Sequence, residues 1–179
     1  MPVTGTYYYI GLPMTTETPP QKHFRLLEGP EAFREALIEA ARHSRRDFLV
    51  FSPTLDPTVY DSVELIETLS ALARSHRRAT LQFLVQDTRP LAAQGHGLVR
   101  LCQRLPSKAG IRRITTDIET KAAAFALGDR EQLVYQNDPD TYRGFWDWRA
   151  GAQVKTLREI FARAWETAED DPQLRQLTL

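Results

Sequence analysis

The chain has 179 residues, of which 42% are hydrophobic and 26% are charged, and its 23 basic side chains are balanced by 23 acidic ones. This composition is typical of a folded globular domain and argues against a disordered chain. Because the net charge is zero, the molecule has no overall electrostatic attraction for nucleic acid or an anionic membrane, so any such binding requires a local patch.

Several sequence features are absent, and each absence excludes a class of protein or site. No apolar run approaches the roughly 20 residues that cross a bilayer, and the N-terminus lacks a signal-peptide pattern, so we expect a cytoplasmic protein with no membrane partner. The single cysteine, Cys102, excludes an internal disulfide and shares a helical stripe with Leu98 and Leu101, which indicates packing rather than a nucleophile. No Cys/His set has metal-ligand spacing, so we expect neither a metal nor a cofactor.

The two ends of the chain differ in composition from its middle. Residues 1–21 are rich in proline, threonine and tyrosine without any periodicity, and we expect them to form a loose N-terminal arm. Residues 169–179 are expected to form a C-terminal tail. The folded domain is then predicted to span residues 22–168.

Between these ends, strands alternate with amphipathic helices. Helices are expected to begin at Pro30, near Val63 and near Leu98, and a long helix should close the domain, because apolar residues recur there at three- and four-residue intervals. Strands are expected at residues 23–29, 47–52, 79–87 and 110–115, then a hairpin over 121–138 and the closing helix over 152–168. This alternation predicts an α/β single domain with a mixed, mostly parallel sheet flanked by helices.

The segments that lead into two of these strands are nearly identical. Residues 41–51 read ARHSRRDFLVF and residues 73–83 read ARSHRRATLQF. In one interpretation, the cations complement the negative C-terminal ends of two helices. In the other, they form a shared basic surface that contacts phosphate groups. That surface would consist of Arg42, Arg45, Arg46, Arg74, Arg77 and Arg78.

The hairpin reads KAAAFALGDREQLVYQND, and the closing helix contains LREIFARAWETA. With the order of units along the chain, these segments resemble one half of a phospholipase D superfamily domain. The motif of that superfamily is His-x-Lys-x4-Asp, followed after six residues by Gly-Ser-x-x-Asn. When its aspartate is placed on Asp129, its histidine falls on Ala122 and its lysine on Ala124. The later motif positions fall on Gln136, Asn137 and Asp140, so only the aspartate matches.

In that superfamily the histidine attacks phosphorus and the lysine stabilises the phosphate charge, and alanine can do neither. The resemblance therefore implies a phospholipase D-like domain without its catalytic pair, a pseudoenzyme similar to bacterial domains of unknown function that in some cases accompany an acetyltransferase domain. It also implies a homodimer, because superfamily members with one such half tend to pair. A plainer interpretation of the hairpin is that Ala122, Ala124 and Ala126 share one packed strand face, and that Asp129 has a structural role in the turn.

A second group of candidate residues follows the strand at 79–87. Asp87, Arg89 and His96 come after the strand's carboxyl end, where α/β sheets commonly place ligand sites, and Asp129 could support them. His96 could act as a base or an anion contact there. Alternatively, it begins a helix and its ring is satisfied by the backbone. Asp56, Tyr60 and Asp61 follow the preceding strand and would add to the same rim.

The segment NDPDTYRGFWDWRAG, residues 137–151, is predicted to be a loop rich in aromatic residues and arginine. Such clusters are typical of interface anchors and stacking surfaces, so Tyr142, Arg143, Trp146 and Trp148 are candidate binding residues. The alternative is that the aromatic side chains cap the core.

Three functional hypotheses follow. The first is a non-catalytic phospholipase D-like domain that acts in binding or assembly, with itself or with a protein partner. The second is a phosphodiesterase-like or other hydrolase whose site has moved to the surroundings of His96. The third, ranked last because the net charge is zero, is a nucleic-acid or phosphate-binding module.

Overall fold

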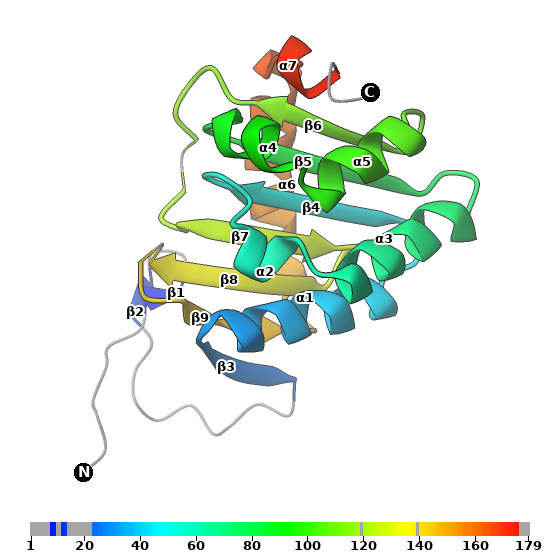
Figure 1. Ribbon diagram of the computed structural model, residues 1–179. Helices are drawn as coiled ribbons and strands as arrows, with labels where there is room; N and C mark the ends of the chain where they lie inside the picture. Colours follow the sequence, from blue (N-terminus) through cyan, green and yellow to red (C-terminus); the bar gives the residue numbers. More distant parts are fainter. Residues whose placement is uncertain (1–7, 10–11, 14–22, 119, 139, 176–179) are drawn as a thin grey trace.

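A computed structural model describes residues 8–9, 12–13, 23–118, 120–138 and 140–175. Within them, one seven-stranded sheet has the order β3-β9-β8-β7-β4-β5-β6 (Figure 1). The strands of this sheet are β3 Phe24–Glu28, β4 Asp47–Ser52, β5 Thr80–Val85, β6 Ala109–Arg113, β7 Ala124–Gly128, β8 Gln132–Asp138 and β9 Arg143–Asp147. A separate ladder pairs β1 (Tyr8–Tyr9) with β2 (Leu12–Pro13).

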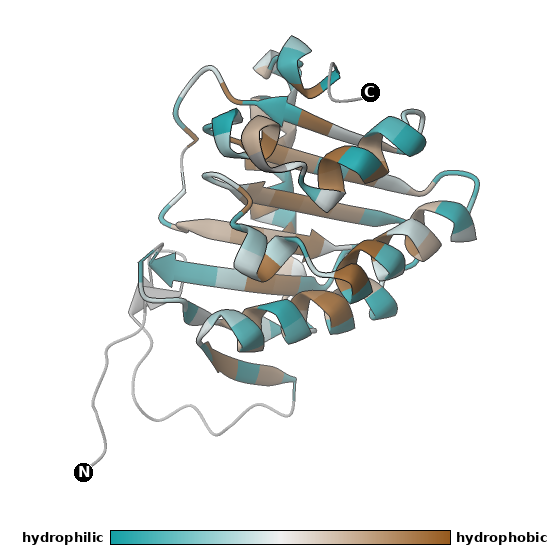
Figure 2. Cartoon of the chain, viewed as in Figure 1, coloured by the Kyte–Doolittle hydropathy of each residue, from teal (hydrophilic) through white to brown (hydrophobic). Residues whose placement is uncertain are grey.

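Helices cover both faces of the sheet (Figure 1). The helices are α1 Pro30–His43, α2 Pro57–Tyr60, α3 Val63–Ser75, α4 Arg89–Gln94, α5 Gly97–Arg104, α6 Gly151–Thr167 and α7 Pro172–Arg175. One core cluster joins α1, α3 and α5 to one face, and a second joins α6 to the other. Hydrophobic residues are concentrated on the central strands and on the sides of the helices that face them (Figure 2). The α/β class and the flanking helices are therefore confirmed.

The proportion of parallel pairs in the sheet needs a correction. Only β4, β5 and β6 are parallel neighbours, whereas the other four pairings are antiparallel. Helical crossovers join β4, β5 and β6, which makes parallel pairing natural. From β7 onward the chain reverses through short connections, so β7, β8 and β9 form an antiparallel meander, and β3 pairs with its outer edge.

The strand β9 corrects the predicted aromatic loop. Residues 143–147 pair with both β3 and β8, and Phe145 and Trp146 are buried. A bulge in β8 between Gln136 and Asp138 precedes the connection to this strand. The segment resembles a loop because turn-forming residues crowd around it, yet both neighbouring strands supply hydrogen-bond partners.

Two smaller expectations also change. The helix expected near Val63 begins at that residue, but Val63 is 75% exposed, so this apolar side chain does not belong to the buried face of α3. The predicted tail is attached to the domain as far as Arg175, because Glu169 forms a bridge with Arg113 and Leu174 is buried. Residues 176–179 and most of the predicted N-terminal arm, residues 1–7, 10–11 and 14–21, lie outside the described residues.

Two edges of the sheet matter for function. We call the edge at which β4, β5 and β6 begin the amino edge, and the opposite one the carboxyl edge. The turn between β7 and β8 lies at the amino edge, because Gly128 pairs with Phe48 near the start of β4. In Figure 1 the amino edge is on the right.

Candidate functional site

Asp87 and Arg89, predicted as site residues, pair with each other at the carboxyl edge. An Arg89 Nη lies 2.7 Å from an Asp87 carboxylate oxygen, and this contact lowers the pKa of Asp87 to about 2. Both side chains open on a hollow of about 580 Å³, which Arg113 and Asp171 also line. A hydrogen bond from Thr88 lowers the pKa of Asp171. A paired carboxylate of such low basicity is poorly suited to act as a general base near neutral pH.

His96 is enclosed and fully hydrogen-bonded. Its residue is 1% exposed, with Nε2 2.9 Å from the carbonyl oxygen of Leu55 and Nδ1 3.1 Å from the backbone nitrogen of Leu98. Because a carbonyl can only accept and an amide N–H can only donate, the ring is the neutral tautomer protonated on Nε2. Burial lowers its pKa. His96 is thus the N-cap of α5, and neither ring nitrogen is available to a substrate.

Asp129 lies at the amino edge, across the sheet from Asp87 and His96. Its carboxylate accepts hydrogen bonds from three successive backbone amides, those of Arg45, Arg46 and Asp47, at 2.7–3.0 Å. The backbone carbonyl of Asp129 accepts from the guanidinium of Arg158. The structure therefore does not bring together the four candidate catalytic residues, and it gives Asp129 the task of holding the loop before β4.

The positions aligned with the catalytic pair are packed. Ala122 and Ala124 are 7% and 2% exposed. Ala126 packs in the core cluster under α1, as expected for one strand face, but Ala122 belongs to the cluster of Phe125 on the other face. The reason is that β7 begins only at Ala124, so the strand's alternation does not extend back to Ala122.

The aromatic candidates divide into two groups. Tyr142 donates its hydroxyl hydrogen bond to the carboxylate of Asp56, which raises the pKa of Tyr142 to about 12. Arg143 lies 3.7 Å from a carboxylate oxygen of Glu28. These contacts are at the carboxyl edge, where Asp56 and Tyr142 help to hold the loop after β4.

Tyr60 and Asp61, predicted for the same rim, also serve the fold. Tyr60 is buried, and burial raises its pKa. Asp61 accepts a 2.8 Å hydrogen bond from the backbone N–H of Gly97 at the start of α5. Neither side chain adds a free group to the carboxyl edge.

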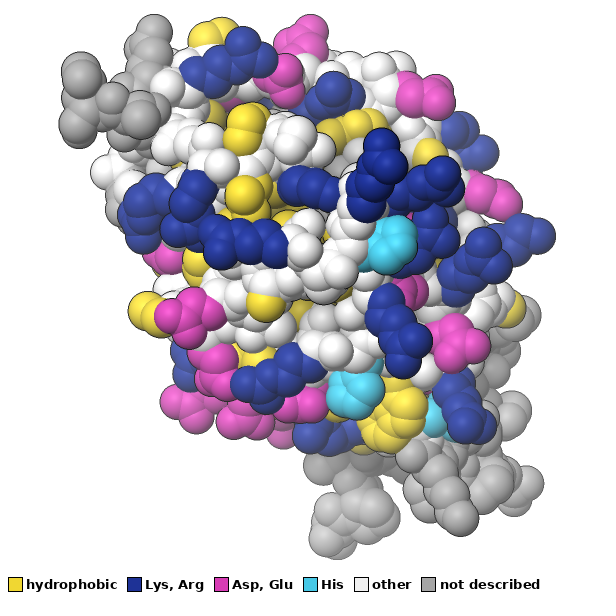
Figure 3. Space-filling model, turned by 90° about the vertical axis from the view of Figure 1, so that its right-hand side faces the viewer, with side chains coloured by type: hydrophobic (Ala, Val, Ile, Leu, Met, Phe, Trp, Pro, Cys, Tyr) yellow, Lys and Arg dark blue, Asp and Glu magenta, His cyan; other side chains and the backbone are white. Residues whose placement is uncertain are grey.

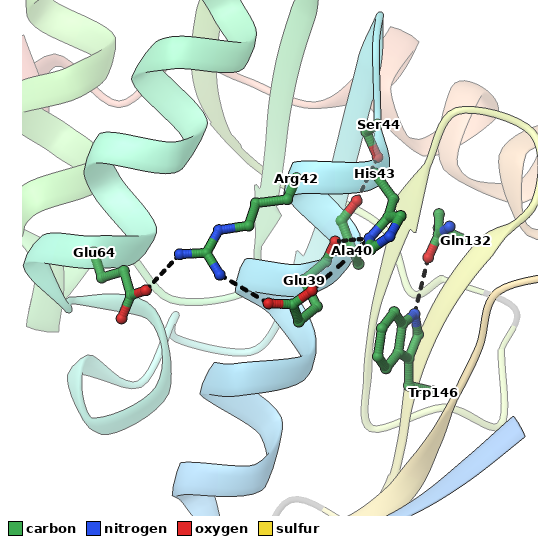
Figure 4. Close-up of polar contacts among 8 residues, drawn as sticks. All are labelled: Glu39, Ala40, Arg42, His43, Ser44, Glu64, Gln132 and Trp146. Carbon is green, nitrogen blue, oxygen red and sulfur yellow. Dashed lines mark hydrogen bonds and ion pairs between the residues drawn. The ribbon is translucent and has the colours of Figure 1, made fainter.

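Trp146 and Trp148 form the second aromatic group, at the amino edge. Trp146 is buried, donates its indole N–H to Gln132 at 2.9 Å (Figure 4), and has the Arg25 guanidinium 5.1 Å from its ring centroid. The ring centroids of Trp146 and Trp148 are 4.7 Å apart. Trp148 keeps part of its surface open to solvent.

The two similar basic segments meet at this same edge. Since β4 and β5 are parallel neighbours, Asp47 is in register with Thr80, and the backbone N–H of Thr80 donates to the carbonyl oxygen of Arg46 at 2.8 Å. The ends of α1, α3 and α5 and the turn between β7 and β8 therefore carry their arginines to one place. We call the exposed members of this group, Arg45, Arg46, Arg74, Arg77, Arg78, Arg104 and Arg130, the arginine edge. Figure 3 shows this face, with Lys and Arg side chains spread across it.

Within the part of the chain that the structure describes, none of the side chains of the arginine edge forms an ion pair or a hydrogen bond. Arg42 differs, because it lies 2.8 Å from Glu39 and 2.6 Å from Glu64 (Figure 4). Of the acids near the edge, Asp129 is occupied by backbone amides and Asp47 by Arg158 and Thr80, while the exposed Glu131 follows Arg130 in the turn between β7 and β8. A protein of zero net charge thus carries a concentrated positive surface.

Sequence reasoning found only part of this surface. It missed Arg104 and Arg130, as well as Lys108, whose ammonium donates to the carbonyl oxygens at the end of α3. The signal for Arg104 and Lys108 was available, because they lie in a third helix-to-strand connection equivalent to the two quoted ones. Arg130 gave no such signal, since its position at the amino edge depends on the antiparallel pairing of β7.

The described residues contain no group of three or more His, Cys, Asp or Glu side chains arranged to hold a metal ion. None of their helices has the length and apolar composition needed to span a bilayer.

The layered sheet with its antiparallel meander defines a phospholipase D-like fold. The structure is similar to Nuc, a phospholipase D family member from Salmonella typhimurium, with a TM-score of 0.55 and 11% sequence identity; the match covers 83% of this chain and 97% of Nuc. It is also similar to NucT from Helicobacter pylori, with a TM-score of 0.54 and 9% identity; that match covers 83% of this chain and 98% of NucT. The archaeal chromatin protein TrmBL2, described as showing a novel mode of DNA binding, is also similar (TM-score 0.60, 15% identity). That match covers 88% of this chain but only 57% of TrmBL2. These likenesses show the fold.

The sequence itself places the chain in a family. Residues 29–177 match the model of DUF7931, a domain of unknown function, and the chain belongs to that family. No curated protein sequence matches it.

Proposed function

We propose that this protein is a non-catalytic phospholipase D-like domain that binds a phosphate-rich polyanion through its arginine edge. The observation that carries the proposal is the gathering of seven exposed arginines on one edge, without ion-pair partners among the described residues. Guanidinium groups suit phosphate oxygens in charge and geometry. Nucleic acid is the polyanion that the structural relatives favour, since TrmBL2 is a chromatin protein with a described mode of DNA binding.

The absence of catalysis is part of the proposal. In support, the positions aligned with the superfamily's nucleophile and cation are the buried Ala122 and Ala124. His96, the alternative nucleophile or base, has both ring nitrogens bound to the backbone. Incubation with generic phosphodiesters tests this point, and turnover that disappears in His96→Asn would overturn it in favour of a relocated active site.

Binding itself is tested by fluorescence anisotropy with labelled nucleic acid at 50–200 mM salt, a range across which phosphate contacts lose much of their affinity. We expect the logarithm of the binding constant to fall linearly with the logarithm of the salt concentration. The variant Arg77→Ala/Arg78→Ala should bind more weakly, with a salt slope smaller by about 2, because each phosphate contact contributes about 1. The matched control is Arg89→Ala/Arg163→Ala, which removes the same charge from exposed sites away from the edge. Equal losses in the two variants, or no binding even at low salt, would refute the proposal.

Pairing of two chains is a second proposal. The strand β3 lies at the end of the sheet, is paired on one side only within the described residues, and exposes Leu26 at 58%. Strand edges of this kind are ready templates for a second chain. Light scattering at high micromolar concentration should give twice the monomer mass, and a monomer at every concentration would exclude a stable homodimer.

A further inference from the structure

We propose that the ligand of the arginine edge is a single-stranded nucleic acid, and that Trp148 stacks on one of its bases. This inference rests on the proposed function and deepens it, because it distinguishes among polyanions. The arginine edge alone recognises phosphate charge, which single strands, duplexes and inorganic polyphosphate all carry. The tryptophan pair beside it would recognise the exposed flat face of an unpaired base.

The tryptophan pair is continuous with the arginine edge. β9 ends at the amino edge, where Asp147 pairs with Leu133 near the start of β8. The Trp146 ring centroid lies 6.4 Å from that of His43, the last residue of α1, and the arginines at 45 and 46 follow two and three residues later. A ligand chain that contacts these arginines therefore reaches the tryptophans without crossing the sheet. Figure 3 shows a hydrophobic patch beside histidine side chains at the lower end of this face.

The two tryptophans have different tasks. Trp146 is held by its hydrogen bond to Gln132 and covered by Arg25, so it offers little surface of its own. It forms a rigid support for Trp148, whose backbone N–H is fixed by a 3.0 Å hydrogen bond to the carbonyl oxygen of His23. A partly exposed aromatic ring that is held from behind is the arrangement used by stacking platforms for unpaired bases.

The length of the surface fits a short single strand. From β6 to β9 the amino edge crosses five strand spacings of about 4.8 Å, or about 24 Å in all. At the rise of about 3.4 Å per phosphate of a stacked strand, this distance accommodates roughly seven phosphates, and a more extended single strand would place fewer there. In a duplex the base faces are stacked on one another inside the helix, and exposing one means taking it out of the stack. A duplex can therefore use the arginines but not the tryptophan.

The test compares three ligands at equal salt: a labelled ten-nucleotide oligothymidylate, a ten-base-pair duplex and inorganic polyphosphate. We expect oligothymidylate to bind most tightly and to quench tryptophan emission, while polyphosphate binds without that quenching. Trp148→Ala should weaken oligothymidylate binding by about 5- to 100-fold, the range for one stacked base, and leave polyphosphate binding unchanged. Trp148→Phe, which keeps an aromatic ring, should retain most of the affinity. Circular dichroism and urea unfolding check that both variants fold.

The outcomes separate this inference from the proposed function. If all three ligands bind equally, without tryptophan quenching and without an effect of Trp148→Ala, base stacking is refuted while polyanion binding stands. If no ligand binds, both proposals fail. If no ligand binds but the protein self-associates at low salt, and Arg77→Ala/Arg78→Ala abolishes this association, the arginine edge binds an acidic surface of a second copy instead. Duplex binding tighter than single-strand binding would also overturn the inference.

Discussion

Asp129 and Arg46 are 83 residues apart in the sequence, yet a carboxylate oxygen of Asp129 lies 2.9 Å from the backbone nitrogen of Arg46. The same carboxylate also binds the amides of Arg45 and Asp47, so the turn between β7 and β8 holds the loop that carries two members of the arginine edge. Asp129, on which the superfamily's aspartate was placed, therefore joins two parts of the fold.

Replacing Asp129 should loosen this junction. We expect Asp129→Asn to lower the free energy of unfolding by about 1–2 kcal/mol, because the amide keeps an acceptor but loses the charge. Asparagine also tolerates the positive φ of 48° at this position. Asp129→Ala should cost about 2–4 kcal/mol, since it leaves three amides without their partner. Urea unfolding measures both, and an Asp129→Ala variant as stable as the parent would contradict the assigned role.

His96 should make stability depend on pH. Burial lowers its pKa in the folded state, whereas the unfolded chain binds a proton at the ordinary value near 6.5. The unfolded state therefore binds more protons as the pH falls below about 6.5, and stability should decrease by up to about 1.4 kcal/mol per pH unit until the folded-state pKa is reached.

The measurement is urea unfolding between pH 5 and pH 8, with His96→Asn for comparison. Asparagine can cap α5 but does not titrate, so the unfolding free energy of its variant should depend less on pH. The variant should also be less stable at pH 8, because it loses the hydrogen bond to Leu55. The other histidines contribute equally to both profiles. Parallel profiles would mean that His96 gains its proton in the folded protein as easily as in the unfolded one.

Introducing the superfamily's catalytic pair should not create catalysis. In Ala122→His/Ala124→Lys, the lysine would enter a buried strand position, so we expect a loss of about 2–4 kcal/mol in unfolding free energy and no hydrolysis of bis-p-nitrophenyl phosphate. Ala124→Met introduces similar length without charge and separates overpacking from desolvation. Activity in the double variant would show that a working phosphodiester site surrounds these positions.

Cys102 should be a poor nucleophile. It is a half-buried residue of α5 that packs against the core, and burial raises the pKa of its thiol to about 12. At pH 8 its reaction with Ellman's reagent should be at least about 100-fold slower in the folded protein than in urea, because the thiolate is the reacting species. Equal rates in the two conditions would place the thiol in solvent.

The parts of the fold that could be predicted are those specified by local pattern. Pro30 and Glu31 mark the start of α1, and the continuous apolar run of residues 47–52 is the buried strand β4. The resemblance of the two basic segments offered a shared surface as one of two interpretations, and parallel neighbours joined by helices do begin at the same edge.

The remaining features depend on partners that are distant in the sequence. β9 becomes a strand because β3 and β8 pair with it on both sides, and no local pattern around Gly144 indicates this. The position of His96 at a helix entry was readable, whereas its bond to Leu55 depends on a loop from another unit. The tryptophan pair was found as a cluster, but its position beside the arginines followed only from the sheet order.

The amides of residues 45–47, filled by Asp129, have a consequence for selectivity. Successive backbone N–H groups of this kind are rigid cradles that elsewhere hold a phosphate in one orientation. Here the cradle is permanently occupied by the protein's own carboxylate. At this cradle, a bound phosphate chain would therefore contact guanidinium groups on long flexible stems, which adjust to many spacings, rather than a fixed set of amides. Phosphate contacts of this kind would carry no preference for base sequence.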